Sequence, residues 1–278
     1  MKTLYVTSFS KTLFQTTGHL MIESFIKHKI GDLFVAYESF DFPSVIQYIE
    51  NNNIKHTDIM EYKFLKDWLE DNKNLIPTVF GGSMPSPSVS GPPDGNKKMQ
   101  KKVYDYWNKK ASLWFRKVAS LHYAIHHYPE YDNVVWIDSD CYFKKNLPIE
   151  IVENMLTKYD IFYHQGTYRN LKNFGFESGF IGFNREKGFG VVKLVSDFYT
   201  SKKYIDIQRW DDGYIFKIII QGLLKKKKIK AIDLVDDKKP GKRLDAINKG
   251  IYADYVVHKK GIHKNLPNLG DDNKLKKK

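Results

Sequence analysis

The sequence predicts an α/β protein built on a mostly parallel sheet flanked by helices. Short apolar runs rich in β-branched residues, typical of buried strands, recur along the chain. Between them lie segments whose apolar residues repeat at helical spacing. Strand, helix, strand and helix in succession favour a parallel sheet with right-handed crossovers. The 278 residues suffice for one large domain of this class, or for two small ones at most.

The first part of the chain sets up this alternation. After the apolar run at 2–7, the residues Ser8-Phe9-Ser10 are predicted to form a polar turn. Pro43 opens a helical segment at the first-turn position, where proline is tolerated. The predicted elements are strands at 2–7 and 33–37 and helices at 20–26, 42–49 and 63–70.

The amino-acid composition changes at 81–97. This segment is dense in proline, glycine and serine, which disfavour regular structure. A loop of this length inside a compact domain is usually functional or disordered. We interpret it as a flexible, lid-like loop near the active site, with an idle insertion as the alternative.

The second part of the chain resumes the alternation with a strong helical pattern at 109–128. Trp210-Asp211-Asp212-Gly213 then opens a later helix. The predicted elements are helices at 109–128, 147–155, 191–199 and 214–224 and strands at 134–137, 160–164, 179–184, 231–235 and 255–258.

Two carboxylates follow the strand at 134–137. Asp138 and Asp140 are separated by one residue, Ser139. Open α/β sheets bind ligands at the carboxyl ends of their strands, and carboxylate oxygens suit Mg²⁺ or Mn²⁺. The alternative is a plain polar turn after a strand.

Composition limits the class of protein. The chain is 42% hydrophobic and 28% charged, as in ordinary soluble proteins. An aromatic content of 15% leaves rings for stacking on sugars or bases. Because no long apolar run or signal peptide is recognised, a cytoplasmic location is expected. The single Cys141 excludes an intrachain disulfide and fits a reducing compartment.

The net charge of +13 is concentrated in two lysine clusters, at 225–230 and 274–278. Such clusters suit phosphorylated substrates or an anionic membrane surface, which would make the protein membrane-peripheral. The alternative is that these lysines bind nothing and belong to a solvated surface and, at 266–278, to a basic disordered tail. No nucleic-acid-binding module is recognised, so a nucleic-acid partner is not expected.

A resemblance to a known family emerges from blocks around the two aspartates. Residues 114–121, 128–132 and 134–140 resemble the GT-A fold, DxD-motif glycosyltransferases that use nucleotide sugars, most closely the glycogenin-like and the galactosyl- and xylosyltransferase-like enzymes. The resemblance implies a Rossmann-like, mixed sheet in a single domain at 1–265. It also implies that Asp138 and Asp140 hold a divalent cation, and that Lys117 faces the donor.

Two further segments resemble the family and follow in the same order along the chain as they do there. Residues 176–184 are similar to a strand that lies beside the donor sugar, with Glu177 where asparagine is more usual. Asp211 and Asp212 are similar to a carboxylate that contacts sugar hydroxyls or steadies positive charge at the anomeric carbon. The alternative for these aspartates is simple helix capping.

The last landmark lies near the C-terminal end of the sequence. His258, Gly261 and Lys264 reproduce the spacing H-x-x-G-x-x-K of the glycogenin-like enzymes. The resemblance implies that His258 is the third metal ligand, and that Gly261 and Lys264 contact the diphosphate. One imidazole with two carboxylates favours Mn²⁺ over Mg²⁺.

Together these landmarks predict a Mn²⁺-dependent hexosyl- or pentosyltransferase. It would move a sugar from a nucleoside-diphosphate sugar to a glycan, glycoprotein or glycolipid acceptor, and the resemblance leans towards retention of configuration. Thr7, Ser8 and Ser139 are expected to border the donor, and Glu177, Asp211 and Asp212 the reacting carbon. The alternatives are a nucleotidyltransferase and a non-enzymatic basic module that binds nucleic acid or membrane.

Overall fold

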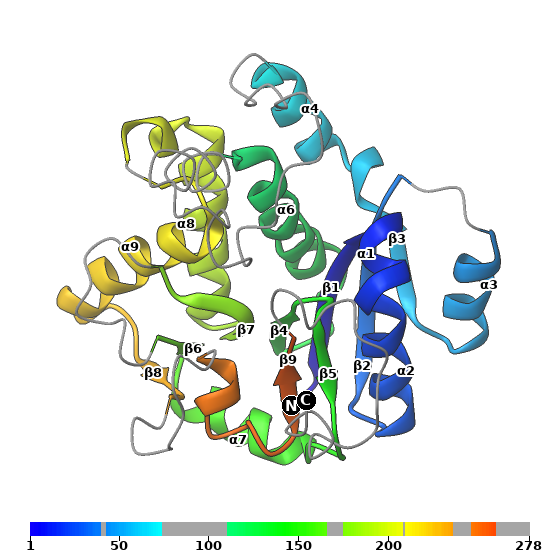
Figure 1. The fold of residues 1–278 in the computed structure, drawn as a ribbon. Coiled ribbons are helices and arrows are strands. Elements are labelled where there is room, and N and C mark those ends of the chain that lie inside the picture. The colour runs from blue at the N-terminus through cyan, green and yellow to red at the C-terminus, as the bar shows by residue number, and fades with distance from the viewer. Residues whose placement is uncertain (40–42, 74–109, 166–174, 208, 236–245, 260–278) are drawn as a thin grey trace, which may run out of the picture.

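The computed structural model describes residues 1–39, 43–73, 110–165, 175–207, 209–235 and 246–259. The predicted lid-like loop at 81–97 and the predicted tail at 266–278 lie outside these residues. Figure 1 shows a central sheet with helices on both of its faces.

Seven strands form the main sheet, in the order β3-β2-β1-β4-β7-β6-β8. The first four of these are mutually parallel, and β6 pairs in parallel with β8. Among the strands of the described residues, β7 alone runs against its neighbours in this sheet, β4 and β6. The predicted mixed, mostly parallel sheet is therefore confirmed. The strands are β1 (Thr3–Ser10), β2 (Asp32–Glu38), β3 (Lys55–Asp58), β4 (Asn133–Ile137), β6 (Ile161–His164), β7 (Glu177–Asn184) and β8 (Ala231–Asp233).

Helices cover the two faces of this sheet and close one core on each. The α6-side core gathers side chains from α4, α6, α8 and α9, and the α2-side core gathers side chains from α2, α3 and α7. Alternation along each strand divides its side chains between them, so Trp136 faces α6 while Val135 and Ile137 face α2. The helices are α1 (Lys11–Leu13), α2 (His19–Lys27), α3 (Pro43–Asn51), α4 (Lys63–Asp71), α6 (Ala111–His127), α7 (Ile149–Lys158), α8 (Gly188–Thr200) and α9 (Asp212–Lys225).

A second, two-stranded sheet stands beside the main one. It pairs β5 (Cys141–Phe143) with β9 (Val256–His258) in antiparallel fashion. The predicted strand at 255–258 thus exists, but it joins β5 rather than the main sheet. Figure 1 shows the two short strands side by side in front of β4.

The predicted turn at Ser8-Phe9-Ser10 is wrong. Strand β1 continues to Ser10, because Ser8 and Phe9 stay paired with Ala36 and Tyr37 of β2 and Phe9 is fully buried. Ser10 then caps α1, its Oγ accepting a hydrogen bond of 3.4 Å from the amide of Leu13.

The other predicted strands and helices are found, with their ends shifted by a few residues. Strand β3 was missed, since Lys55-His56-Thr57-Asp58 has no apolar side chain. Among the described residues, no helix has the length and apolar character needed to cross a membrane.

Gly182 of β7 provides a test of the packing between β6 and β7. It lies opposite Phe162, and a Cβ at position 182 would come within 2.5 Å of the ring atom Cζ. We expect Gly182→Ala to lower the free energy of unfolding by about 1–3 kcal/mol, the usual cost of overpacking a core. Urea denaturation measures the change.

Gly222→Ala is the matched control, because nothing lies within 4 Å of a Cβ at that position of α9. Alanine there should stabilise the protein by up to about 1 kcal/mol, since it is the better helix former. Equal effects of the two substitutions would contradict this account of the β6–β7 packing.

Candidate active site

The small sheet brings the two ends of the predicted site together. In the β5–β9 ladder Cys141 lies opposite His258, and Asp140 immediately precedes β5. The backbone oxygen of Asp140 accepts a hydrogen bond of 2.9 Å from the amide of Lys259. The segment that carries His258 is therefore held against the turn that carries both aspartates.

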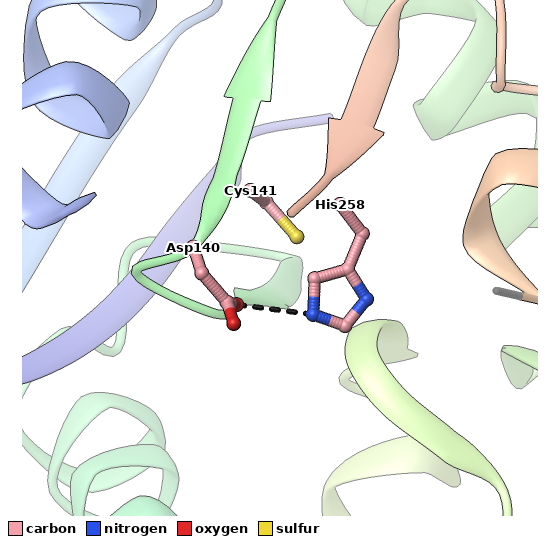
Figure 2. Close-up of side chains that lie close together, drawn as sticks. All are labelled: Asp140, Cys141 and His258. Carbon is pink, nitrogen blue, oxygen red and sulfur yellow. Dashed lines mark ion pairs between the residues drawn. The ribbon is translucent and has the colours of Figure 1, made fainter. Parts of the chain in front are cut away.

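Asp140 and His258 are in direct contact (Figure 2). Asp140 Oδ1 lies 3.0 Å from His258 Nε2, and the two side chains are only 7% and 2% exposed. Asn248 holds the backbone of His258, because its side chain exchanges two hydrogen bonds of 2.9 Å with that backbone. The imidazole is thus placed firmly beside the carboxylate.

Two groups of side chains here have the composition of a cation site. Asp138, Glu177 and His258 each offer a ligand atom within 4.8 Å of the others, and so do Asp140, Cys141 and His258. Two ligands at right angles on one ion, each at about 2.1 Å, are separated by about 3 Å. The 3.0 Å between Asp140 and His258 fits this spacing. These residues therefore suit a divalent ion.

Lys117 of α6 is buried at the centre of the site. Its Nζ lies 3.1 Å from both Asp138 Oδ1 and Asp212 Oδ2, and it donates to the backbone oxygen of Ser178 at 2.6 Å. Burial lowers the pKa of Lys117, but the neighbouring Asp138 and Asp212 raise this pKa by more, so that it lies above its ordinary value. The ammonium ion consequently ties α6 to β7, to α9 and to the turn after β4.

The carboxylate of Asp138 has two distinct sides. Its Oδ1 accepts hydrogen bonds from Trp136 Nε1 at 2.6 Å and from Lys117 Nζ at 3.1 Å. Its Oδ2 lies on the side of Gly179, where an added Cβ would meet that oxygen at 2.9 Å and His258 Cε1 at 3.3 Å. The glycine at 179 therefore leaves the space in which Asp138 and His258 approach each other.

Asp211 and Asp212 play different parts at the start of α9. Asp211 is the N-cap, accepting 3.1 Å from the amide of Tyr214, and it pairs with Arg209 at 2.7 Å. Burial raises the pKa of Asp211, although the Arg209 guanidinium opposes the shift. Asp212 instead faces Lys117. The capping alternative thus describes Asp211, and Asp212 joins the network around Asp138.

The remaining predicted residues are spread more widely. Glu177 is 19% exposed, with its Oε1 3.9 Å from His258 Nδ1. Ser139 is buried in the turn between β4 and β5. Thr7 is fully buried within β1, among residues that face α2, whereas Ser8 is half-buried on the opposite face. Gly261 and Lys264 lie outside the described residues.

Sequence reasoning missed several residues that shape the site. Trp136 could have been noticed, because it precedes Asp138 by two positions and so shares its face of the strand. Cys141 also carries a local signal, because a thiol next to Asp140 is a second type of metal ligand. Asn248 and Ser178 offer no such signal, since their roles arise from contacts between distant segments.

Comparison with known proteins places the fold. The sequence matches no family model and no curated protein. A solved glycosyltransferase involved in the glycosylation of the major capsid of PBCV-1 is similar in structure, with a TM-score of 0.50 and 12% identity over 95% of this chain and 96% of that chain. The chain thus has the GT-A type, Rossmann-like fold, as the resemblance implied.

Two further similar structures have lower TM-scores. Mouse xyloside xylosyltransferase 1 has a TM-score of 0.48 and 11% identity over 84% of this chain and 85% of its own. The glycosyltransferase GlyE of Streptococcus pneumoniae TIGR4 has a TM-score of 0.44 and 12% identity over 84% of this chain, which spans only 45% of the GlyE chain.

The buried Lys117 network generates a stability prediction. Lys117→Met leaves Asp138 and Asp212 without their shared cation, and breaking a buried ion pair from one side costs about 3–5 kcal/mol. We expect a loss of this order in the free energy of unfolding, measured by urea denaturation.

The control is Lys66→Met, which breaks the exposed pair between Lys66 and Glu61. Pairs of this kind contribute at most about 1 kcal/mol. If the two variants lost the same stability, the central role given to Lys117 would be refuted.

Proposed function

We propose that this chain is a glycosyltransferase that depends on a divalent cation and moves a sugar from a nucleoside-diphosphate sugar to an acceptor hydroxyl. One observation carries the proposal. Asp140 and His258, distant in sequence, are in contact beside Asp138. They meet at the carboxyl end of β4, next to the reversed strand β7. Open α/β sheets bind their ligands at such positions.

The proposed cation ligands are Asp138, Asp140 and His258. Two carboxylates with one imidazole suit Mn²⁺, with Mg²⁺ as the harder alternative. An ion bound there supplies Lewis-acid stabilisation of the departing nucleoside diphosphate. The resemblance adds Gly261 and Lys264 next to the diphosphate, where a lysine offsets its growing negative charge.

The other side chains orient the reactants. Lys117 fixes Asp138 from one side and Asp212 from the other. Asp212 is therefore the better candidate of the two neighbouring aspartates for contact with the donor sugar, because Asp211 is engaged as a helix cap. Glu177, partly exposed near His258, borders the anomeric carbon on the opposite side. Retention of configuration stays the expectation from the resemblance.

The proposal also covers the residues beside the donor and the class of acceptor. Ser8 and Ser139 border the donor, whereas Thr7, predicted to do the same, is fully buried within β1. The acceptor is a glycan, glycoprotein or glycolipid hydroxyl. Residues 225–228 form an exposed lysine cluster at the C-terminal end of α9, for which contact with an anionic membrane surface stays a prediction.

A panel of nucleotide sugars tests the proposal. We expect the purified full chain with Mn²⁺ to release nucleoside diphosphate from at least one donor, and a chelator to abolish the release. Asp140→Asn and His258→Gln should each weaken Mn²⁺ binding by about 100-fold or more, since partners that merely orient a ligand are already worth 10–100-fold.

Asp254→Asn serves as the control, because Asp254 is an exposed carboxylate just before β9. It should bind Mn²⁺ like the parent. Absence of transfer or hydrolysis with every donor, together with no metal-dependent nucleotide binding, would falsify the proposal.

Gly179→Ala gives a second test of the same cation site. The new Cβ would press on Asp138 Oδ2 and on His258 Cε1, at 2.9 and 3.3 Å. We expect Mn²⁺ affinity to fall by about tenfold or more, as for other losses of ligand orientation. The measurement is the electron paramagnetic resonance signal of free Mn²⁺ in a titration.

Gly190→Ala is the control for this variant, since nothing lies within 4 Å of a Cβ there. Its Mn²⁺ affinity should equal that of the parent. A Gly179→Ala protein that is folded and binds Mn²⁺ normally would remove Asp138 and His258 from the proposed ligand set.

A further inference from the structure

We propose that Asp140, Cys141 and His258 form a binding site for a thiophilic divalent ion, Zn²⁺ above all, and that this site overlaps the proposed donor cation site. Zinc bound there excludes the donor cation and so inhibits the enzyme. The inhibition rests on the proposed function, whereas the binding of zinc does not.

The ladder between β5 and β9 creates this group. Cys141 and His258 are direct cross-strand partners, so their side chains project from the same face of the small sheet. Asp140 stands immediately before Cys141 and contacts His258 at 3.0 Å. One ligand atom from each residue lies within 4.8 Å of the other two. Figure 2 shows the sulfur and the carboxylate both directed towards the imidazole ring.

The donor atoms match zinc better than manganese. Zn²⁺ takes thiolate sulfur at about 2.3 Å, imidazole nitrogen at about 2.0–2.1 Å and carboxylate oxygen at about 2.0–2.2 Å. Three protein ligands with a fourth position left for water is an arrangement that zinc adopts in proteins. Affinity for a site with nitrogen or sulfur also rises from Mn²⁺ to Zn²⁺, and soft thiolate increases the preference. Cys141 therefore makes this part of the site prefer Zn²⁺ over Mn²⁺.

The environment of the sulfur shows what zinc binding has to displace, because the buried thiol donates to a backbone oxygen. Cys141 is only 1% exposed, and its Sγ lies 3.6 Å from the backbone oxygen of Gly179. Metal binding exchanges the thiol proton for the ion, so that Cys141–SH and Zn²⁺ give a zinc thiolate and one proton released to solvent. Asp140 and His258 are also 7% and 4% exposed, so all three ligands lie in one buried place.

The two proposed ions cannot be bound together. Both ligand sets use Asp140 and His258; the proposed donor-cation set adds Asp138, whereas the zinc set adds Cys141. In the zinc set, the thiolate of Cys141, on the small sheet, takes the place of the carboxylate of Asp138. Zinc and manganese are consequently competitors for one imidazole.

Cobalt provides a direct spectroscopic test. Titration of the full-length protein with Co²⁺ should give a thiolate-to-cobalt charge-transfer band in the near ultraviolet, which Zn²⁺ then removes. Because Cys141 is the only cysteine, the band has one origin. Cys141→Ser should lose the band, and the ratio of Zn²⁺ to Mn²⁺ affinity should fall by about tenfold or more, since even partners that merely orient a ligand are worth 10–100-fold.

Further variants separate the alternatives. His258→Gln should weaken the band, and Asp254→Asn should leave it unchanged. Absence of the band in the folded parent protein, or its full survival in His258→Gln, overturns the proposed zinc site. A band that behaves as expected in a protein without activity towards any donor upholds the zinc site and counts only against the proposed glycosyltransferase.

Discussion

The pairing of β5 with β9 is the constraint on which the candidate site depends. Three residues a side make a weak ladder by themselves, since isolated two-stranded sheets are marginal in water. The surrounding core supports it. Phe143 and Val256 are buried in the α2-side core, and the amide of Phe143 donates to Ser24 Oγ of α2 at 3.0 Å. The contact between Asp140 and His258 therefore relies on packing that neither residue makes.

Electrostatics explains why such an arrangement calls for a cation. Four carboxylates gather here, and within the network Lys117 is the cation that faces two of them. Charges of one sign are costly to bury without compensation. A divalent ion reduces this cost, which is the physical basis for the proposed metal dependence. The four carboxylates are Asp138, Asp140, Glu177 and Asp212.

Most of the fold could be predicted because its signals are local. Helices such as α6 show their apolar spacing, and β4 is a continuous apolar run. Strand β3 has no such signal, and β1 was shortened because Ser8 and Ser10 look like turn residues in a sequence while their pairing partners lie on β2. Local pattern cannot reveal hydrogen bonds that another segment supplies.

The candidate site, like the fold, could be predicted only in part. The order of the landmarks placed His258 with Asp140, and the structure brings these two side chains into contact. Sequence could not choose between Asp211 and Asp212, because both stand where a helix begins and only the position of Lys117 distinguishes them. Nor could it show Lys117 bridging two carboxylates, since Asp138 and Asp212 meet only in the folded chain.

The spacing of the two aspartates has a structural consequence that the motif alone does not show. Asp138 follows β4 of the main sheet, whereas Asp140 leads into β5 of the small sheet. A cation bound by both therefore links two sheets that share no strand. Ligand binding stabilises the state that binds it. In the proposed enzyme the metal would thus reinforce the short β5–β9 ladder that positions His258, so that cation binding and the order of the site support each other.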